Sequence, residues 1–200
     1  EIDLVVHRVV HGGHAHKDSK WITSDIKISI ADNSHLAPLH NPLNLAGIEF
    51  SEELFPTARQ VAVFDTAFHQ SIPEHARQYA IPATLAHAQD IVKSGFHGIS
   101  HRYVSNYAVE HFGLANAKII SIHLGNGASM SAIQNGICKD NSMGFSPSSG
   151  LIMGTRSGDI DHSIIFYLVN TMHYDIQEVE DMLNNQSGLL GLTGMSDYRD

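Results

Sequence analysis

An aspartate follows an apolar run that has the composition of a buried strand. The stretch VAVFDTAFHQ, residues 61–70, places four apolar residues before Asp65 and Thr66. Ligands in open α/β sheets bind at the carboxyl ends of strands, where loops converge and helix ends direct their amides. An isolated aspartate at such a position more often bonds its own turn as an Asx motif. Asp65 is therefore a candidate site residue whose role depends on its neighbours.

Two arginines and a histidine lie among glycines and small residues. Arg8 precedes a Gly-Gly turn in HRVVHGG, His97 stands between glycines in GFHGISH, and Arg156 lies in GLIMGTRSGDID. A guanidinium in such a loop is a fixed fork for phosphate or carboxylate. Arg156 could equally pair with Asp159 or Asp161 as a structural bridge, and spacing alone does not separate the two interpretations.

A turn with two glycines could hold an anion. HLGNGAS, residues 123–129, joins two strand-like runs through Gly125 and Gly127. Glycines let the backbone approach a ligand closely and can turn several N–H groups toward one anion. The same Asn-Gly pair is also the ordinary hairpin turn, so the motif alone is a weak signal. The sequence has no P-loop and no protein-kinase glycine loop, so a nucleotide would bind on another fold.

The histidines raise the question of a metal site. The tract HGGHAHK at residues 11–17 has no nearby Cys or Glu, and such tracts are usually solvated. His97 and His101 have the spacing of two zinc ligands on a helix, but Gly98 stands where the HExxH pattern needs Glu. We therefore interpret His101 as structural and keep a histidine-based metal hydrolase as a minor alternative.

Strands must deliver these residues to a common region. Apolar and β-branched runs bounded by Gly, Asn or Asp predict strands at residues 4–10, 61–64, 119–124 and 128–133. The QNG at residues 134–136 predicts an antiparallel hairpin. Strands that alternate with helices indicate an α/β fold with mixed sheets flanked by helices.

Helical periodicity lies between and after these strands. Residues 100–113 predict a helix that Ser100 caps and Gly113 ends. Its apolar face consists of Tyr103, Val104, Tyr107, Ala108 and Phe112. A second helix follows Asp175, which is its expected cap, and ends before Gly188.

Two further segments are less regular. Residues 164–169 favour a helix but leave a strand possible. Residues 37–58 contain three prolines and predict an irregular connection with a short helix. A domain boundary just after Asp65 would divide the chain into residues 1–66 and residues 67–200.

Composition excludes several classes of function. The chain has 200 residues, 42% of them hydrophobic, and a net charge of −9 with only 12 scattered Lys and Arg. This balance is typical of a folded globular protein and offers no basic groove for nucleic acid. No apolar run reaches the roughly 20 residues that span a bilayer. The single cysteine, Cys138, suits a reducing compartment, so we expect a cytoplasmic protein without nucleic-acid or membrane partners.

Seven motifs in order along the chain resemble the acetate kinase family, the acyl-phosphate-forming branch of the sugar kinase, Hsp70 and actin superfamily. They are HRVVHGG, LAPLHNP, VFDTAFHQSIP, GFHGISHRYV, HLGNGAS, SMGFSPSSGLIMGTRSGDID and GLLGLTGMSDYRD. The resemblance implies a two-domain fold of that superfamily with a cleft between the domains. It also implies ATP-dependent phosphorylation of acetate, or of propionate, to the acyl phosphate and ADP.

The resemblance implies a role for each residue at a matching position. Arg8 binds the substrate carboxylate, and Asp65, His97 and Arg156 are catalytic. The small pocket for the alkyl end of the acid would be lined by Val10, Leu39, His40, Phe96 and Pro147. The ATP-binding residues would be His123, Leu124, Gly125, Asn126, Gly127, Asp197, Tyr198 and Arg199.

Cofactors and partners follow from the same resemblance. It implies Mg²⁺ or Mn²⁺ with ATP as co-substrate, and a homodimer. A carboxylic acid is already ionised at pH 7 and needs no base, so we expect Asp65 to orient magnesium, its waters or Arg8. The metal would lie beyond the direct reach of this chain, because the magnesium-binding Asn and Glu of the family are not in it.

The chain departs from the family pattern at His14, which replaces Glu, at Ile99, which replaces Thr, and at His162, which replaces Pro. Ile99 removes a hydroxyl that we expect near the phosphoryl site. The chain also lacks an Asn-Ala-Gly-Ser-Ser-Ser phosphate loop and a glycine-rich ATP loop. We therefore expect an incomplete chain with weak or no turnover by itself, and a noncatalytic binding module is the alternative from another class of function.

Overall fold

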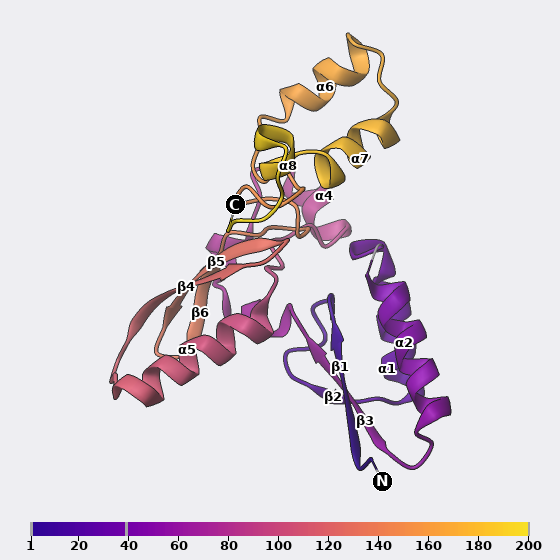
Figure 1. The fold of residues 1–200 in the computed structure, drawn as a ribbon, viewed down its shortest axis with the longest axis vertical. Coiled ribbons are helices and arrows are strands. Elements are labelled where there is room, and N and C mark those ends of the chain that lie inside the picture. The colour runs from indigo at the N-terminus through magenta and orange to yellow at the C-terminus, as the bar shows by residue number, and fades with distance from the viewer. Residues whose placement is uncertain (1, 39, 200) are drawn as a thin grey trace.

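The computed structural model describes residues 2–38 and 40–199, which form two three-stranded sheets with helices packed on them (Figure 1). The first sheet has the order β1-β3-β2, with β1 at Leu4–Val9, β2 at Lys20–Trp21 and β3 at Arg59–Phe64. β1 and β3 are parallel, whereas β2 is antiparallel to β3. Because β1 and β3 run in the same direction, their carboxyl ends deliver Arg8 and Asp65 to one edge of the sheet.

Two helices cover one side of the first sheet (Figure 1). They are α1 at Ser24–Asp32 and α2 at Asn41–Leu54, with a 3₁₀ turn, η1, at Asn33–Leu36 between them. Val9, Ile30, Ile48 and Phe64 form the core between sheet and helices.

The prediction of an irregular connection with a short helix at residues 37–58 was wrong in its extent. α2 has 14 residues, and Pro42 stands in its first turn. A proline is tolerated there because its missing N–H would have no partner inside the helix. The proline therefore starts the helix instead of interrupting it.

The second sheet is an antiparallel meander in the order β4-β5-β6. Its strands are β4 at Lys118–Leu124, β5 at Ala128–Gln134 and β6 at Ile137–Asn141. Asn135 and Gly136 connect β5 to β6 with φ values of 54° and 74°, which confirms the predicted hairpin. Positive φ at both central residues is what a two-residue hairpin turn requires.

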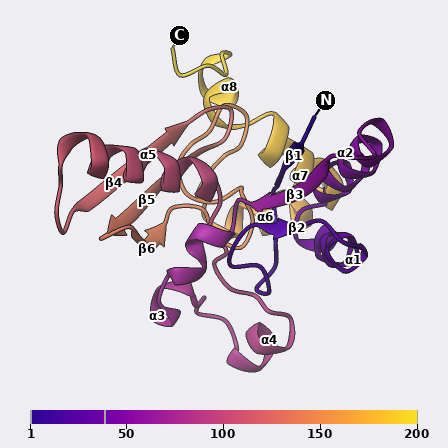
Figure 2. The ribbon, with the colours of Figure 1, turned by 90° about the horizontal axis from the view of Figure 1, so that it is seen from below.

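Helix α5, at Gly98–Phe112, lies along one face of the second sheet (Figure 2). It begins two residues before the predicted cap Ser100, because His97 in the left-handed region, with φ 58°, is its N-cap. Gly113 ends it with φ 62°, as predicted. Its predicted apolar face stays exposed, with Tyr103 and Phe112 each 68% accessible, and the covered face carries His101 and Ser105 instead.

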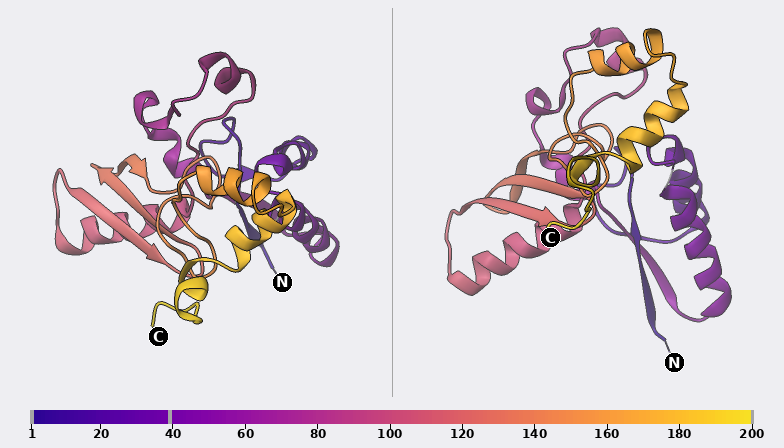
Figure 3. Two further views of the ribbon diagram at one scale, coloured as in Figure 1. Left: turned by 90° about the horizontal axis from the view of Figure 1, so that it is seen from above. Right: turned by 45° about the horizontal axis from the view of Figure 1, so that its top comes forward.

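Short elements connect and follow the sheets. η2 at Ala67–Ser71, α3 at Glu74–Arg77 and α4 at Ala83–Ala88 link the two sheets. α6 at Ser163–Asn170 and α7 at Ile176–Asn185 lie at the opposite end of the molecule from the N-terminus (Figures 1 and 3), and α8 at Gly188–Thr193 follows. The segment that left a strand possible is thus helical. Asp175 caps α7 through a capping box with Glu178, which confirms that prediction.

A second apolar cluster joins the two sheets. Val10 and Ala37 pack with Phe96, Ala128, Met143 and Met153, so segments that follow both sheets share one core. Cys138 is buried in a third cluster, and burial raises the pKa of its thiol to about 12, so it is an inert core residue. Within residues 2–38 and 40–199, no helix has the length and apolar character needed to cross a membrane.

Candidate active site

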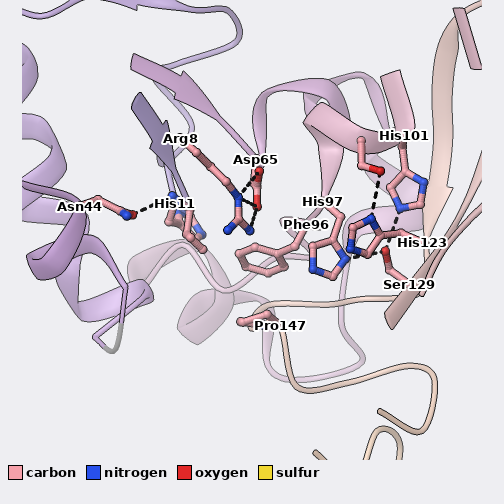
Figure 4. A network of polar contacts seen from close by, with 12 residues as sticks. Arg8, His11, Asn44, Asp65, Phe96, His97, His101, His123, Ser129 and Pro147 are labelled. Atoms are coloured by element: carbon pink, nitrogen blue, oxygen red, sulfur yellow. Dashed lines mark hydrogen bonds and ion pairs between the residues drawn. The ribbon is translucent and has the colours of Figure 1, made fainter. Parts of the chain in front are cut away.

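Arg8 and Asp65 form an ion pair where β1 and β3 end (Figure 4). Arg8 Nη2 donates to Asp65 Oδ2 at 2.6 Å, and Nε donates to both carboxylate oxygens at 3.1 and 3.2 Å. The Asp65 side chain is 2% exposed, whereas that of Arg8 is 58% exposed. The hydrogen bond to Asp65 raises the pKa of Arg8, so the guanidinium stays charged. Among the described residues, none accepts a hydrogen bond from Arg8 Nη1, so this edge of the guanidinium can bind a ligand.

Backbone hydrogen bonds fix the position of Asp65. Its N–H donates to the Val9 carbonyl at 3.0 Å, and its carbonyl accepts from the Gly98 N–H at 2.9 Å. A Cβ on Gly98 would lie 2.2 Å from the Asp65 carbonyl oxygen, so only glycine allows α5 to start against this strand end. Asp65 therefore does not act as a simple Asx cap of its own turn, and the strand end and the helix start hold each other.

His97 and Arg156 meet at Gly127. A Cβ on Gly127 would lie 3.2 Å from His97 Nε2 and 3.4 Å from Arg156 Nη1, so both side chains face this one glycine. His97 also stacks on His123, with ring centroids 4.1 Å apart. Burial and the neighbouring charges of Arg8 and Arg156 lower the pKa of His97 to about 3. The ring is therefore neutral at pH 7 and can offer an N–H but no charge.

Arg156 is a partly buried cation held by a carbonyl. Its Nη1 donates to the Pro147 carbonyl at 2.6 Å, and burial lowers its pKa. Asp159 instead accepts from the Gly150 N–H, and Asp161 from the Ser163 N–H. The alternative of a structural Arg156–Asp bridge is therefore wrong, and the guanidinium can accept an anionic partner.

His40 lies near the charged side chains of Arg8, Asp65 and Arg156. It is the N-cap residue of α2, and its side chain makes no capping hydrogen bond. Burial lowers its pKa, and the fields of Arg156 and Arg8 lower it further, whereas Asp65 opposes them. His40 thus lies within electrostatic reach of all three side chains.

The predicted apolar lining is partly assembled. Val10 and Phe96 are buried in one cluster. The Pro147 carbonyl accepts from Arg156, and Figure 4 shows Pro147 on the same side of the site as Phe96 and His97. Asn44 accepts from the Val10 N–H at 3.1 Å and fixes this part of the loop after β1. Leu39 lies outside the described residues.

The predicted ATP-binding segments line one cavity of about 580 Å³. The turn between β4 and β5 contributes Leu124, Gly125 and Asn126, and the C-terminal segment contributes Ser196, Asp197, Tyr198 and Arg199. The same turn continues to Gly127, where His97 and Arg156 meet. His123, which precedes this turn, does not line the cavity but stacks on His97. The turn therefore connects the cavity to the side chains of His97 and Arg156.

A buried network that sequence reasoning missed lies behind His97. Ser129 Oγ lies 2.9 Å from His97 Nδ1 and 2.7 Å from His101 Nε2 (Figure 4). His101 Nδ1 lies 3.0 Å from Ser121 Oγ. His123 Nδ1 contacts Ser100 Oγ at 2.9 Å. The available signal was the alternation of polar residues, Ser121 and His123 on β4 and Ser129 and Ser131 on β5, because residues two apart share a face of a strand.

The described residues do not form a metal site by themselves. In the ranges 2–38 and 40–199, no three His, Cys, Asp or Glu side chains gather as metal ligands would. The rings of the early histidine tract have separate partners: His11 contacts Ser94, His14 contacts Asp90, and His16 stacks on Phe64. Both oxygens of Asp65 accept from Arg8, so in this structure the carboxylate orients Arg8.

The three departures from the family pattern lie in three different surroundings. Ile99 lines a cavity of about 360 Å³ with Phe68, Arg102 and Tyr103. His14 accepts from Arg77 Nη2 at 3.1 Å and contacts Asp90 at 2.9 Å. His162 precedes α6 and packs against Phe166. The expected effect of Ile99 on the phosphoryl site stays a prediction.

Comparisons with known proteins agree on one family. A model of the acetokinase family matches residues 1–200. An acetate kinase of Flavobacterium johnsoniae is 54% identical over the whole chain, which covers 50% of that protein. Among solved structures, a propionate kinase from Francisella tularensis has a TM-score of 0.95 at 47% identity, over 98% of this chain and 51% of that one. An acetate kinase of Porphyromonas gingivalis has a TM-score of 0.93 at 46% identity, over 100% of this chain and 51% of that one. The chain thus spans about half the length of the relatives that it matches.

Proposed function

Because this chain belongs to the acetokinase family, we propose that it carries the acid-binding and phosphoryl-transfer face of an enzyme that phosphorylates acetate with ATP. The products are acetyl phosphate and ADP, and the reaction is reversible. Its acceptor is a carboxylate oxygen, which makes the enzyme a phosphotransferase with a carboxyl acceptor.

One observation supports this proposal most strongly. The side chains of His97 and Arg156 both face Gly127. The turn that ends at Gly127 also lines the cavity, together with residues 197–199. A nucleotide whose base lies in that cavity would direct its phosphates along the turn toward the two side chains. Phosphoryl transfer asks chiefly for such positioning and for donors around the migrating group.

Each charged residue has one task in this arrangement. Arg8 binds the carboxylate of the acid through the guanidinium edge that Asp65 leaves available, and Asp65 holds Arg8 in place. Arg156 supplies positive charge to the transferring phosphoryl group, and neutral His97 donates an N–H to it. The acid needs no general base because it is ionised at pH 7.

The metal and the assembly are further parts of the proposal. We propose that Mg²⁺ or Mn²⁺ arrives on the phosphates of ATP, and no step assigned to this chain depends on a metal ligand from it. The division at residue 66 would place Arg8 and Asp65 in one domain and His97 and Arg156 in the other. A cytoplasmic homodimer completes the proposal and depends on the family resemblance alone.

The test is a hydroxylamine trap for acyl phosphate, run with ATP, magnesium and acetate on the gene product at its native length. The expected result is an ATP-dependent hydroxamate signal that Arg156→Ala lowers by about 100-fold or more, because a preorganised donor to the transferring group is lost. Silence from a folded protein of native length would overturn the proposal and favour a noncatalytic binding module.

Propionate is a second candidate substrate, because the propionate kinase of Francisella tularensis matches this chain with a TM-score of 0.95. One methylene is worth about 0.8 kcal/mol, or roughly fourfold in specificity. The same trap with propionate decides between the two acids, since the larger kcat/KM identifies the preferred one.

A further inference from the structure

Three buried side chains form a continuous line of hydrogen bonds that ends at the partly buried His97. The line runs from Ser121 on β4 to His101 on α5, then to Ser129 on β5, and then to His97 Nδ1. Each step is between 2.7 and 3.0 Å. His101, Ser121 and Ser129 are all buried, so water does not compete for these groups.

Each hydroxyl has one proton, and each neutral imidazole has one ring proton. Burial lowers the pKa of His97 to about 3 and that of His101 to about 4, so both rings are neutral. In one arrangement Ser129 accepts from both rings, but its own O–H, on a fully buried side chain, then has no acceptor in the described part of the chain. Otherwise the protons point in one of two directions along the line. Either every proton points toward His97, or every proton points toward Ser121.

The two directions leave different groups without a partner. If the protons point toward Ser121, its O–H donor lacks an acceptor in the described part of the chain, and this side chain is only 4% exposed. If they point toward His97, the remaining donor is Nε2–H, which faces Gly127 on a side chain that is only partly buried. A buried donor without an acceptor is costly, so the second direction is favoured.

We propose that Ser129, His101 and Ser121 are positioning residues that fix His97 in the tautomer with its proton on Nε2. Ser121 donates to His101 Nδ1, His101 Nε2–H donates to Ser129, and Ser129 donates to His97 Nδ1. The use of the resulting Nε2–H, as a donor to the transferring phosphoryl group, rests on the proposed function. The tautomer itself does not.

The test is the two-bond ¹H–¹⁵N spectrum of the chain labelled with ¹⁵N-histidine, at pH 7.5 and without ligands. The His97 signals are assigned by their absence in His97→Gln. The expected wild-type spectrum shows His97 Nδ1 as an unprotonated nitrogen and Nε2 as a protonated one. Protonated Nδ1, or a mixture of the two tautomers, would overturn the proposal.

Two variants then test the line itself. Ser129→Ala should convert His97 to a mixture of tautomers, and Ser121→Ala should do so partly although Ser121 does not contact His97. Ser105→Ala is the matched control, because this buried serine on α5 donates to the Arg102 carbonyl and is not in the line. A His97 spectrum unchanged in both Ser129→Ala and Ser121→Ala would overturn the proposal.

Turnover gives a separate measurement in the protein of native length. Ser129→Ala should lower kcat by about tenfold, less than the 10²–10³ expected for losing a donor completely, with the KM for ATP nearly unchanged. If the parent protein forms no acyl phosphate, the proposed function fails while the spectrum still decides the tautomer. If Ser129→Ala alters the tautomer but not kcat, the use of Nε2–H in the reaction is wrong.

Discussion

At the residue scale, Asp65 is a buried carboxylate whose two oxygens both accept from Arg8. Three roles were open to it from the sequence, namely to orient magnesium, its waters or Arg8, and this contact favours the third. Nothing in the sequence around Asp65 identifies Arg8 as its partner, because the two residues are 57 positions apart and meet only through the parallel pairing of β1 and β3.

This contact leads to a prediction for Asp65→Asn in the protein of native length. An amide keeps the shape of the side chain but loses the charge that holds Arg8. The KM for the acid should therefore rise by about tenfold, which corresponds to roughly 1.4 kcal/mol, the order of magnitude of one charge-assisted hydrogen bond. The magnesium dependence should stay as in the parent, which initial rates over a magnesium titration measure.

The matched control is Asp140→Asn, which removes the charge of an exposed ion pair with Lys93. Exposed pairs contribute little, so this variant should behave like the parent. A shift of the magnesium optimum in Asp65→Asn, with an unchanged KM for the acid, would show that the carboxylate serves the metal instead.

At the element scale, the start of α5 was the main error of the sequence analysis in the site region. Local propensity places the cap at Ser100 because serine is a common N-cap and glycine disfavours a helix. The structure starts the helix at Gly98 because the Asp65 carbonyl approaches this position too closely for a side chain. Local patterns predicted β1, β3, β4 and β5, the hairpin and the cap at Asp175, but they missed β2. The start of α5 depends on a tertiary contact that no local pattern contains.

Two glycine substitutions should have opposite effects on stability. Gly98→Ala puts a Cβ 2.2 Å from the Asp65 carbonyl oxygen, so the free energy of unfolding should fall by about 2 kcal/mol or more. Gly47→Ala lies inside α2 with no atom within 4 Å of its Cβ, so the free energy of unfolding should rise by about 1 kcal/mol. Urea denaturation of the three chains measures both changes, and a neutral Gly98→Ala would contradict the close approach.

At the scale of the whole molecule, the site is assembled from residues 8 to 199, on both sheets and the loops that follow them. The motifs implied a set of site residues whose roles stay predictions, and the structure brings Arg8 to Asp65, His97 to Arg156, and residues 124–126 to residues 196–199. The line from Ser121 to His97 could not be predicted, because its hydrogen bonds connect a helix to two strands whose relative placement no motif encodes.

Several buried histidines also give the molecule a predictable response to acid. Burial lowers the pKa of His69 and His97 to about 3, and that of His11 and His101 to about 4, from 6.5. Below pH 6.5 the unfolded chain binds more protons than the folded chain. The neutral rings therefore contribute their full share of the free energy of unfolding only above pH 6.5. This share is lost as the pH falls from 6.5 toward 3–4.

We therefore predict that the free energy of unfolding falls steeply between pH 6.5 and pH 4.5. In His69→Gln the slope with pH should become shallower by the equivalent of one proton, even though the variant is less stable at every pH. His75→Gln, at an exposed position, should leave the slope unchanged. Denaturant titrations at several pH values measure the slope, and equal slopes in the parent and His69→Gln would contradict a neutral buried His69.

The central claim is that His97 and Arg156, which face Gly127, serve the transfer of a phosphoryl group to a carboxylate oxygen. The most direct measurement is a ³¹P NMR spectrum of the protein of native length with ATP, magnesium and acetate labelled with ¹⁸O in both carboxylate oxygens. We predict ADP and an acyl phosphate whose phosphorus signal carries the isotope shift of one ¹⁸O, because the bond forms between phosphorus and the acid oxygen. The appearance of AMP with pyrophosphate, or of unlabelled phosphate alone, would contradict the claim.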